Sequence, residues 1–528
     1  MRIGRRSSAA GTARIQKVRT GAAALLVALI VTWQPPQRAT GAVPPDAAVR
    51  GAEDSAVRLP TQHDSILVFA AHPDDEILGA GGLIHAAVRA GARVHVVLFT
   101  NGDGYLAGVD AGFRTLLSTP DRFVEYGRRR QHEAIAAARH LGVPAENVVF
   151  LGYPDRGLAV LWGPGWACDR LYTSPYTHRN RSPYALAYRP GAAYCGHHVL
   201  EDVTSLLRQV QPTIIVSHHP GDTHRDHWAA GEFVAAALER LRTEDVPWVK
   251  HVRVWSYLVH RGVWPVPSGY APGVPLTPPA DLSGDGTRWT PYELTHADQD
   301  AKQRAALEYR TQMQLLRPYM LSFMRQNELF DAHPPAYPSA VDGKHLPIGA
   351  GELWDRLPTV IRGTPGSVLV RAIEGSARVD RVGVAKDATR LYVAVRLKHA
   401  AIRQAEYRVP ITLFYRDGRT AKLRLVFRSP QTLTVSPQRG DGLPLPRGAV
   451  ARSADRRINI ALPLEGLGHP EALLLHVETT GPFRTPVDRS AWALIRLVPT
   501  AAYAVSGAAP AHVNRRPLLW ILESRGMW

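Results

Sequence analysis

Short apolar runs alternate with amphipathic segments over the first half of the chain, and this alternation is compatible with few fold classes. Ser65–Ala71, Arg93–Thr100 and Thr213–Ser217 are almost continuously apolar, which is typical of parallel strands buried on both faces. Further strands are expected at residues 147–151 and 252–258. Helical periodicity lies between the strands, at residues 77–90, 121–141, 198–210, 226–242 and, later, 297–316. The pattern predicts an α/β fold with a Rossmann-like, doubly wound and mostly parallel sheet.

The 528 residues exceed one ordinary domain of roughly 100–200 residues. Gly21–Trp33 is an uncharged run after a basic stretch. It is too short for a membrane span of about 20 residues and typical of an export signal. Residues 1–41 are therefore predicted to be a signal peptide or an uncleaved anchor, and residues 42–61 a linker. We expect the α/β domain at 62–345 and an exported protein, periplasmic or secreted.

The pattern of apolar and polar residues changes after about Trp354. Short, often alternating segments are separated by turn residues, at 367–373, 391–397, 411–415, 422–427, 458–462 and 473–478. This spacing predicts an antiparallel all-β sandwich over residues 346–505, followed by a tail at 506–528. The order of segments resembles carbohydrate-binding sandwich modules, and a purely structural packing module is the alternative.

Charge and cysteine content limit which binding partners and which disulfide are expected. The net charge is +17, of which residues 1–41 contribute +7 and the remainder 17 − 7 = +10. The excess is spread out, without the basic runs and interleaved aromatics of a nucleic-acid groove, so no nucleic-acid partner is expected. Membrane contact is expected only through an uncleaved N-terminal anchor. Cys168 and Cys195 commonly would pair as a disulfide in an exported protein, with two buried thiols as the alternative.

Two polar clusters follow two of the buried strands. One spans His72–Glu76 (HPDDE), and the other spans His218–His227 (HHPGDTHRDH). Sites in open α/β sheets form at the carboxyl ends of strands, so both clusters are expected to face one crevice. Imidazole and carboxylate groups together suit Zn²⁺, with Fe²⁺ as another candidate. The alternative is that these residues cap helices or lie at the surface, as Asp226 could.

The two clusters resemble the signatures of the LmbE-like or PIG-L deacetylases, a family that includes N-acetylglucosaminyl de-N-acetylases. AHPDDE ends at Glu76, and HPxDxHxDH ends at His227. Weaker similarities occur at Leu151–Leu158 (LGYPDRGL), at Arg130 and Glu133, and at Tyr309 and Gln312. The resemblance covers roughly residues 62–330.

The resemblance implies particular roles for these residues. His72, Asp75 and His227 would bind zinc, and Asp74 would be the general base. His224 would stabilise the charged intermediate or protonate the leaving amine. Substrate contacts are implied for Arg130, Asp155 and Asp226, and Asp226 could instead orient His224.

The chemistry of amide hydrolysis agrees with these roles. A metal generates a nucleophile at neutral pH, the developing oxyanion needs stabilisation, and the leaving amine needs a proton. One of the adjacent carboxylates, Asp75, would bind the metal, and its neighbour Asp74 would stay free to act as a base.

One position departs from the family pattern. Some members carry a tyrosine directly before the histidine that matches His224, and this chain has Thr223 there. Tyrosines of the long insert at residues 162–193 are candidates for the vacant role, namely Tyr172, Tyr176 and Tyr184.

Together these features predict zinc-dependent hydrolysis of the N-acetyl group of an amino sugar, in a GlcNAc-type glycan or glycoconjugate. A metal-dependent amide or ester hydrolase with a non-sugar substrate is one alternative. A glycan-binding protein without catalysis is the other.

Overall fold

The computed structural model describes residues 57–497 except 116, 283–286, 333, 342–344, 350, 364–376, 402–404, 429–431, 438–446 and 482–485. The predicted signal segment 1–41, residues 42–56 of the linker, the strand expected at 367–373 and the tail 506–528 lie outside these residues. Within the described part of the chain, no helix is both long and apolar enough to cross a bilayer.

A seven-stranded sheet forms the centre of the N-terminal region, in the order β3-β2-β1-β4-β5-β7-β6. Strands β1 to β5 are parallel, and β7 and β6 run antiparallel to their neighbours at one edge. The bounds are β1 Ser65–Ala70, β2 Arg93–Thr100, β3 Val148–Tyr153, β4 Ile214–His218, β5 Arg253–Tyr257, β6 Trp289–Glu293 and β7 Asn327–Asp331. The prediction of a mostly parallel sheet is confirmed.

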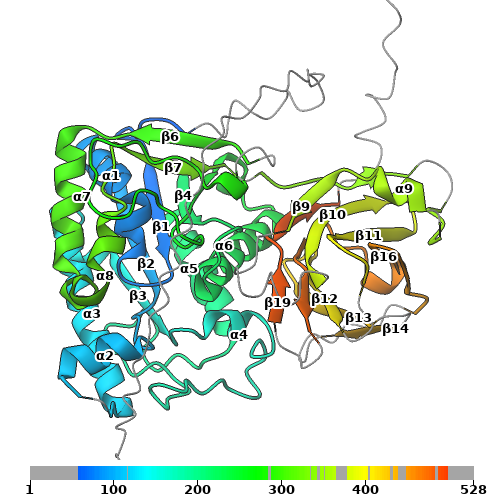
Figure 1. Cartoon of the computed structure of the whole chain (residues 1–528), viewed down its shortest axis with the longest axis horizontal. Helices are drawn as coiled ribbons and strands as arrows, with labels where there is room; N and C mark the ends of the chain where they lie inside the picture. Colours follow the sequence, from blue (N-terminus) through cyan, green and yellow to red (C-terminus); the bar gives the residue numbers. More distant parts are fainter. Residues whose placement is uncertain are drawn as a thin grey trace, which may run out of the picture. The chain divides into compact units, whose positions relative to one another are not determined.

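Helices cover both faces of this sheet (Figure 1). In β1, Ile66 and Val68 pack into one hydrophobic core, whereas Leu67 and Phe69 pack into a second core on the opposite face. This alternation follows from the two-residue repeat of a strand. The helices are α1 Asp75–Arg89, α2 Leu106–Phe113, α3 Pro120–His140, α4 Leu158–Trp162, α5 Gly196–Val210, α6 Arg225–Thr243, α7 His296–Glu308 and α8 Arg310–Leu321.

The predicted continuous helix at 297–316 is wrong in one respect. It is broken into α7 and α8 at Tyr309, whose backbone has φ −75° and ψ 62°. The fully buried Tyr309 side chain donates a hydrogen bond to Glu76. This contact across the fold fixes Tyr309 at the point where the helix breaks.

The C-terminal region is β-rich, as predicted. A six-stranded sheet has the order β15-β16-β11-β10-β8, with β9 on β10, and a seven-stranded sheet has the order β14-β13-β12-β17-β20, with β18 and β19 attached. Residues from both sheets, such as Val393 and Leu425, form a single hydrophobic core. The elements are β8 Ser339–Ala340, α9 Gly351–Asp355, β9 Thr359–Arg362, β10 Val379–Lys386, β11 Arg390–Leu397, β12 Glu406–Phe414, β13 Thr420–Arg428, β14 Thr432–Pro437, β15 Val450–Ala454, β16 Arg457–Pro463, β17 Ala472–Leu475, β18 Glu478–Thr480, β19 Pro486–Arg489 and β20 Ala493–Arg496.

The β-rich region packs directly against α4 and α6. Phe414 and Leu474 join the hydrophobic core that lies beneath these helices. Lys422 Nζ donates to the Trp162 carbonyl at 2.7 Å, and Trp492 Nε1 donates to the Trp228 carbonyl at 3.2 Å. The α/β region and the β-rich region therefore share a buried interface.

The glycines of α1 allow the helix to lie close to the sheet. A Cβ at Gly79 would lie 2.0 Å from the Tyr257 ring, which is itself fully buried. We expect Gly79→Ala to lower the free energy of unfolding by about 1–3 kcal/mol, although alanine favours helix, because the ring cannot move freely. Gly112→Ala in α2 is the matched control, since its Cβ would meet Tyr126 at an ordinary 3.6 Å. Thermal unfolding midpoints test the pair; equal midpoints would contradict the close packing.

Candidate metal centre and active site

The two polar clusters meet at adjacent strand ends. Strands β1 and β4 are parallel neighbours, with Ile66 beside Ile214. The first cluster follows β1, and the second begins at the end of β4. The order of strands reverses between β1 and β4, which is where open α/β sheets place their ligands. The structure thus brings both predicted clusters into one crevice.

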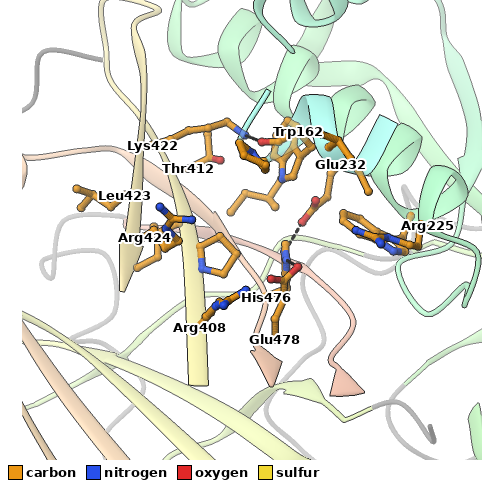
Figure 2. Close-up of a pocket in the computed structure, with 18 of the residues that line it drawn as sticks. Trp162, Arg225, Glu232, Arg408, Thr412, Lys422, Leu423, Arg424, His476 and Glu478 are labelled. Atoms are coloured by element: carbon orange, nitrogen blue, oxygen red, sulfur yellow. Dashed lines mark hydrogen bonds and ion pairs between the residues drawn. The ribbon is translucent and has the colours of Figure 1, made fainter. Parts of the chain in front are cut away.

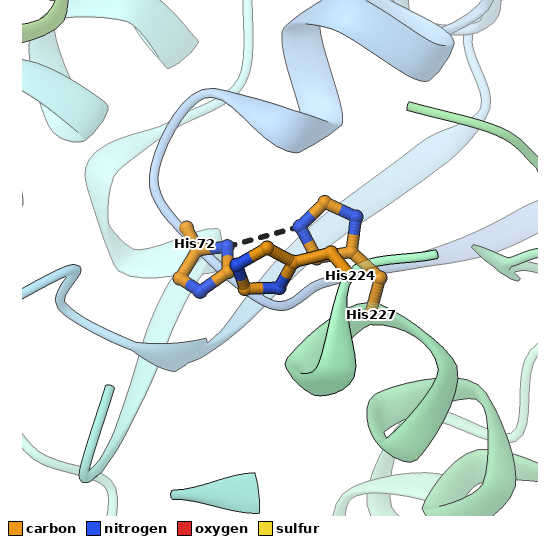
Figure 3. A group of neighbouring side chains, drawn as sticks. All are labelled: His72, His224 and His227. Atoms are coloured by element: carbon orange, nitrogen blue, oxygen red, sulfur yellow. Dashed lines mark hydrogen bonds between the residues drawn. The ribbon is translucent and has the colours of Figure 1, made fainter. Parts of the chain in front are cut away.

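Three donor atoms face one another where the two clusters meet. His72 Nδ1 lies 3.1 Å from His227 Nε2 and 3.2 Å from Asp75 Oδ2. His227 Nε2 lies 3.2 Å from the same carboxylate oxygen. Figure 3 shows His72 and His227 turned toward each other, with His224 beside them. A ligand set around Zn²⁺ at 2.0–2.1 Å would have edges of about 3.3 Å, so this triangle fits one face of such a site.

Both histidines also present their second ring nitrogen to a carboxylate. His72 Nε2 lies 3.1 Å from Asp155 Oδ1, and His227 Nδ1 lies 3.1 Å from Asp222 Oδ2. Metal-binding histidines usually have such a partner, because it fixes the tautomer and the ring orientation. The donor set and its surroundings therefore fit a divalent metal ion.

The charges of the donor atoms suit a cation. Burial raises the pKa of Asp75, but the neighbouring His227 and His218 outweigh it and hold that pKa well below its usual range. Burial lowers the pKa of His227 well below its usual value, against the opposing charges of Asp75 and Asp222. Burial also acts on His72, where the charge of Asp155 outweighs it and raises the pKa. A metal ion at this position would displace that proton.

Other groups of possible ligands overlap this triangle. His224 lies within reach of His72 and His227, and His218 within reach of Asp75 and His227. His218 Nε2, however, already accepts the Ala71 N–H at 2.9 Å. This hydrogen bond uses the lone pair that a metal would need.

Asp74 is held in an unusual backbone conformation beside the triangle. Its φ is 133°, in a region that residues other than glycine rarely adopt. Its N–H donates to Glu76 Oε2 at 3.1 Å, and its carboxylate lies 3.3 Å from Arg130 Nη2. Burial raises the pKa of Asp74, and the charge of Arg130 opposes that rise. The backbone and Arg130 together fix the carboxylate next to the donor triangle.

The three predicted substrate-binding residues have protein partners. Arg130 donates to the carbonyls of Pro73 and Gly102 at 2.6 and 3.1 Å. Asp155 accepts the Gly104 N–H at 2.7 Å while its other oxygen faces His72. The fully buried Asp226 accepts N–H groups at the entry to α4, from Arg156 at 2.5 Å and from Leu158 at 3.0 Å.

His224 caps the N-terminus of α6. Its Nδ1 accepts the Asp226 N–H at 3.3 Å, so a neutral ring carries its proton on Nε2. The His224 and His72 rings meet edge to face, with centroids 4.8 Å apart. Burial and the nearby His72 lower the pKa of His224 to about 4. The geometry therefore presents an N–H donor beside the donor triangle.

The tyrosines of the insert lie near the crevice in different ways. Tyr184 donates its hydroxyl to Asp103 at 2.6 Å. The Tyr176 ring flanks Gly104 beside Asp155, and the Tyr172 ring flanks Gly157. Thr223 donates to the His260 carbonyl at 2.9 Å. Tyr184 is thus already engaged in a hydrogen bond.

His260 and its partner Tyr319 were not predicted from the sequence. The His260 ring lies 5.0 Å from that of His227 and 5.4 Å from that of His224, between centroids. Its Nδ1 lies 2.9 Å from the Tyr319 hydroxyl, which also donates to the Val259 carbonyl. A signal existed, because His260 follows the parallel strand β5 next to β4. Asp222, inside the second cluster, was likewise not assigned a role.

Cys168 and Cys195 form a disulfide. Cys195 precedes α5, and Cys168 lies in the insert that runs past the crevice. The bond closes a segment with a sequence separation of 27, which stabilises the fold by roughly 3 kcal/mol through loss of entropy in the unfolded chain. The adjacent His197 packs edge to face on Trp166, with ring centroids 5.5 Å apart.

Known proteins resemble part of this chain. A deacetylase of 1D-myo-inositol 2-acetamido-2-deoxy-alpha-D-glucopyranoside from Mycobacterium sp. (strain KMS) is 32% identical over 179 residues, 33% of this chain and 50% of that protein. Its counterpart from Rhodococcus opacus is 28% identical over 199 residues, 36% of this chain and 60% of that protein. The chain thus spans about half the length of these curated relatives.

A solved structure and a family model give further similarities. The structure of N,N'-diacetylchitobiose deacetylase from Pyrococcus horikoshii aligns with a TM-score of 0.31 at 17% identity, over 51% of this chain and 81% of that one. The family model described as PIG-L, GlcNAc-PI de-N-acetylase, matches residues 67–238. This match contains both polar clusters, most of β1, strands β2 through β4 and most of α6. Residues 67–238 therefore form a domain of the PIG-L family.

Proposed function

We propose that this protein is a zinc-dependent hydrolase that removes the N-acetyl group of an amino sugar in a glycan or glycoconjugate. The observation that carries the proposal is the triangle of His72 Nδ1, Asp75 Oδ2 and His227 Nε2, with edges of 3.1–3.2 Å, beside the carboxylate of Asp74. The match of residues 67–238 to the PIG-L family supports the N-acetyl specificity. His72, Asp75 and His227 are the proposed ligands, and Fe²⁺ remains the alternative ion.

The neighbouring residues have separate tasks in this proposal. When bound, the ion would act as a Lewis acid and lower the pKa of a coordinated water to about 7. Asp74 takes a proton from the attacking water as the general base and passes it to the amine nitrogen as the C–N bond breaks, so that the amine leaves protonated. His224 donates its Nε2–H to the oxyanion that forms on the acetyl carbonyl. This choice rests on its Nδ1, which already accepts the Asp226 N–H.

The three predicted substrate-binding residues, and the unpredicted Asp222, act through other groups of the protein. Asp155 and Asp222 orient the two ligand histidines through their second nitrogens. Arg130 holds the Asp74 carboxylate and the Pro73 carbonyl. Asp226 holds the start of α4 beside the donor triangle by accepting the Leu158 N–H. We therefore propose that Arg130, Asp155 and Asp226 are positioning residues.

The domain organisation and the location belong to the same proposal. The deacetylase domain would occupy residues 62–345, and the C-terminal β-rich region would be a β-sandwich over 346–505. Export is supported by the disulfide between Cys168 and Cys195, since disulfides persist in oxidising compartments.

Acetate release tests the function directly. The purified chain, loaded with Zn²⁺, would be incubated with N-acetylated sugars of increasing length, from N-acetylglucosamine to chitin oligomers and glycoconjugates. We expect acetate release from at least one sugar and its loss on chelation, with recovery on addition of Zn²⁺. Simple acyl amides and esters form a parallel panel.

The outcomes separate the alternatives. Turnover of non-sugar amides or esters alone would replace the sugar specificity. Sugar binding without acetate release, in a protein that retains zinc, would indicate a glycan-binding protein instead.

A further inference from the structure

A cavity of about 470 Å³ lies outside the metal centre, between the α/β region and the β-rich region. Figure 2 shows its two sides, with α4 and α6 facing strands β12 and β13. The first turn of α6 separates it from the metal centre. His224 and His227 belong to the centre, and the residues Arg225 and Trp228 line the cavity. Its size is that of a ligand pocket.

The cavity is lined by more cationic than acidic side chains. Four arginines and lysines line it, against two glutamates; they are Arg225, Arg408, Lys422 and Arg424 against Glu232 and Glu478. Both glutamates contact His476, through its two ring nitrogens, at 2.8 and 3.4 Å. Both glutamates are therefore engaged with His476. Burial lowers the pKa of this histidine, but the charge of Glu232 outweighs burial and raises it.

Two arginines are left to meet a ligand. Arg225 and Arg424 are exposed, and among the described residues neither guanidinium has a hydrogen-bond or ion-pair partner. They extend from opposite sides of the cavity, one from α6 and the other from β13 (Figure 2). Lys422, by contrast, is fixed, with its Nζ 3.2 Å from the centre of the Trp162 ring. An anion between the two arginines would meet charges from both regions.

The positive surface continues along the outer face of the sheet. Arg408 and Arg424 also line a second hollow, of about 280 Å³, across strands β12, β13 and β14. Its other lining residues are Glu406, Val426, Arg428, Thr434 and Ser436. Glu406 is shared between Arg408 and Arg428, at 2.6 and 2.7 Å, so one acid faces two cations. The cations thus repeat along a track longer than a single small anion.

We propose that the cavity and this track bind an acidic oligosaccharide, with carboxylate or phosphate groups spaced along the chain. The arginines recognise the anionic groups through charge-assisted hydrogen bonds. The hydroxyls of Thr412, Thr434 and Ser436 provide neutral partners for sugar hydroxyls. The site stands on its own residues and does not depend on the proposed hydrolysis. Its position beside the first turn of α6 would leave a bound chain next to the metal centre.

Fluorescence anisotropy with the full chain tests the site. The probes are a labelled oligosaccharide of alternating uronic acid and N-acetylhexosamine, a labelled glycerol-phosphate oligomer and a neutral chitin oligomer. The double variant Arg225→Ala/Arg424→Ala removes the two cations without a partner. We expect at least about tenfold weaker binding of the better acidic probe, a change of about 1.4 kcal/mol. Raising salt to about 0.5 M should weaken wild-type binding.

The matched control is Arg416→Ala/Arg456→Ala. These arginines are exposed, and neither lines the cavity or the track. The control should bind as wild type does; an equal loss in both double variants would reduce the effect to net charge and overturn the site. Equal affinity for the neutral probe, or no binding of either acidic probe, would also overturn it. Acetate release measured in parallel keeps the two proposals apart, since binding without release contradicts only the hydrolase.

Discussion

An Asp74→Asn enzyme is expected to lose about 10²- to 10⁴-fold in kcat for acetate release, the usual contribution of a general base. Asparagine keeps the size of the side chain and removes the group that accepts the proton. The donor triangle of His72, Asp75 and His227 stays intact, so bound zinc should stay unchanged. The measurement pairs steady-state kinetics with the metal content of the same preparation.

Asp121→Asn is the matched control for this variant. Its carboxylate is 85% exposed and lies at the start of α3, paired with Arg179. We expect wild-type kcat there. Undiminished turnover in Asp74→Asn would remove Asp74 from its role as base, whereas loss of zinc in that variant would make it a ligand.

Replacing a metal ligand should lower bound zinc as well as acetate release, unlike Asp74→Asn. His72→Ala or His227→Ala removes a nitrogen from the donor triangle, and we expect both bound zinc and acetate release to fall to background. Asp222→Asn leaves all three ligands but replaces the carboxylate that faces His227 Nδ1 at 3.1 Å with a neutral amide. Loss of such a partner costs about 10- to 100-fold in metal affinity, so excess Zn²⁺ should restore activity.

His63→Ala is the control for the ligand variants, because His63 is exposed and outside the crevice. Competition with a zinc-binding dye gives the affinities. Full zinc occupancy in both His72→Ala and His227→Ala would contradict the proposed site. If excess Zn²⁺ restored the activity of His72→Ala as readily as that of Asp222→Asn, His72 would lie outside the ligand set.

The sequence predicted the parts of the fold and the site that depend on local pattern. Continuous apolar runs identify β1, β2 and β4, because a parallel strand is buried on both faces. The polar clusters directly after β1 and β4 could be placed in one crevice, since parallel neighbours end at the same edge. Strand order therefore predicted that the two clusters meet, whereas the choice of His72, Asp75 and His227 as donors came from the family resemblance.

Features that depend on contacts between distant segments could not be predicted. The break at Tyr309 has no proline or glycine signal and coincides with a hydrogen bond to Glu76. Strand β7 contains the buried Glu328, whose charge is balanced by Lys302 of α7 at 2.7 Å and whose oxygens also accept the Gly82 and Leu83 N–H groups. The substrate-binding role that the resemblance implies for Arg130 stays a prediction, and its sequence neighbours could not reveal that the Pro73 and Gly102 carbonyls accept its hydrogen bonds.

The backbone of Asp74 has an evolutionary consequence. A residue other than glycine at φ 133° raises the free energy of the folded state by about 1–3 kcal/mol. Selection for the carboxylate can maintain that cost only while the carboxylate is needed. In descendants that lose catalysis but keep the fold, we expect glycine to replace this aspartate early, because glycine adopts the same backbone without strain. The residue at this position would then distinguish active from inactive members of the lineage.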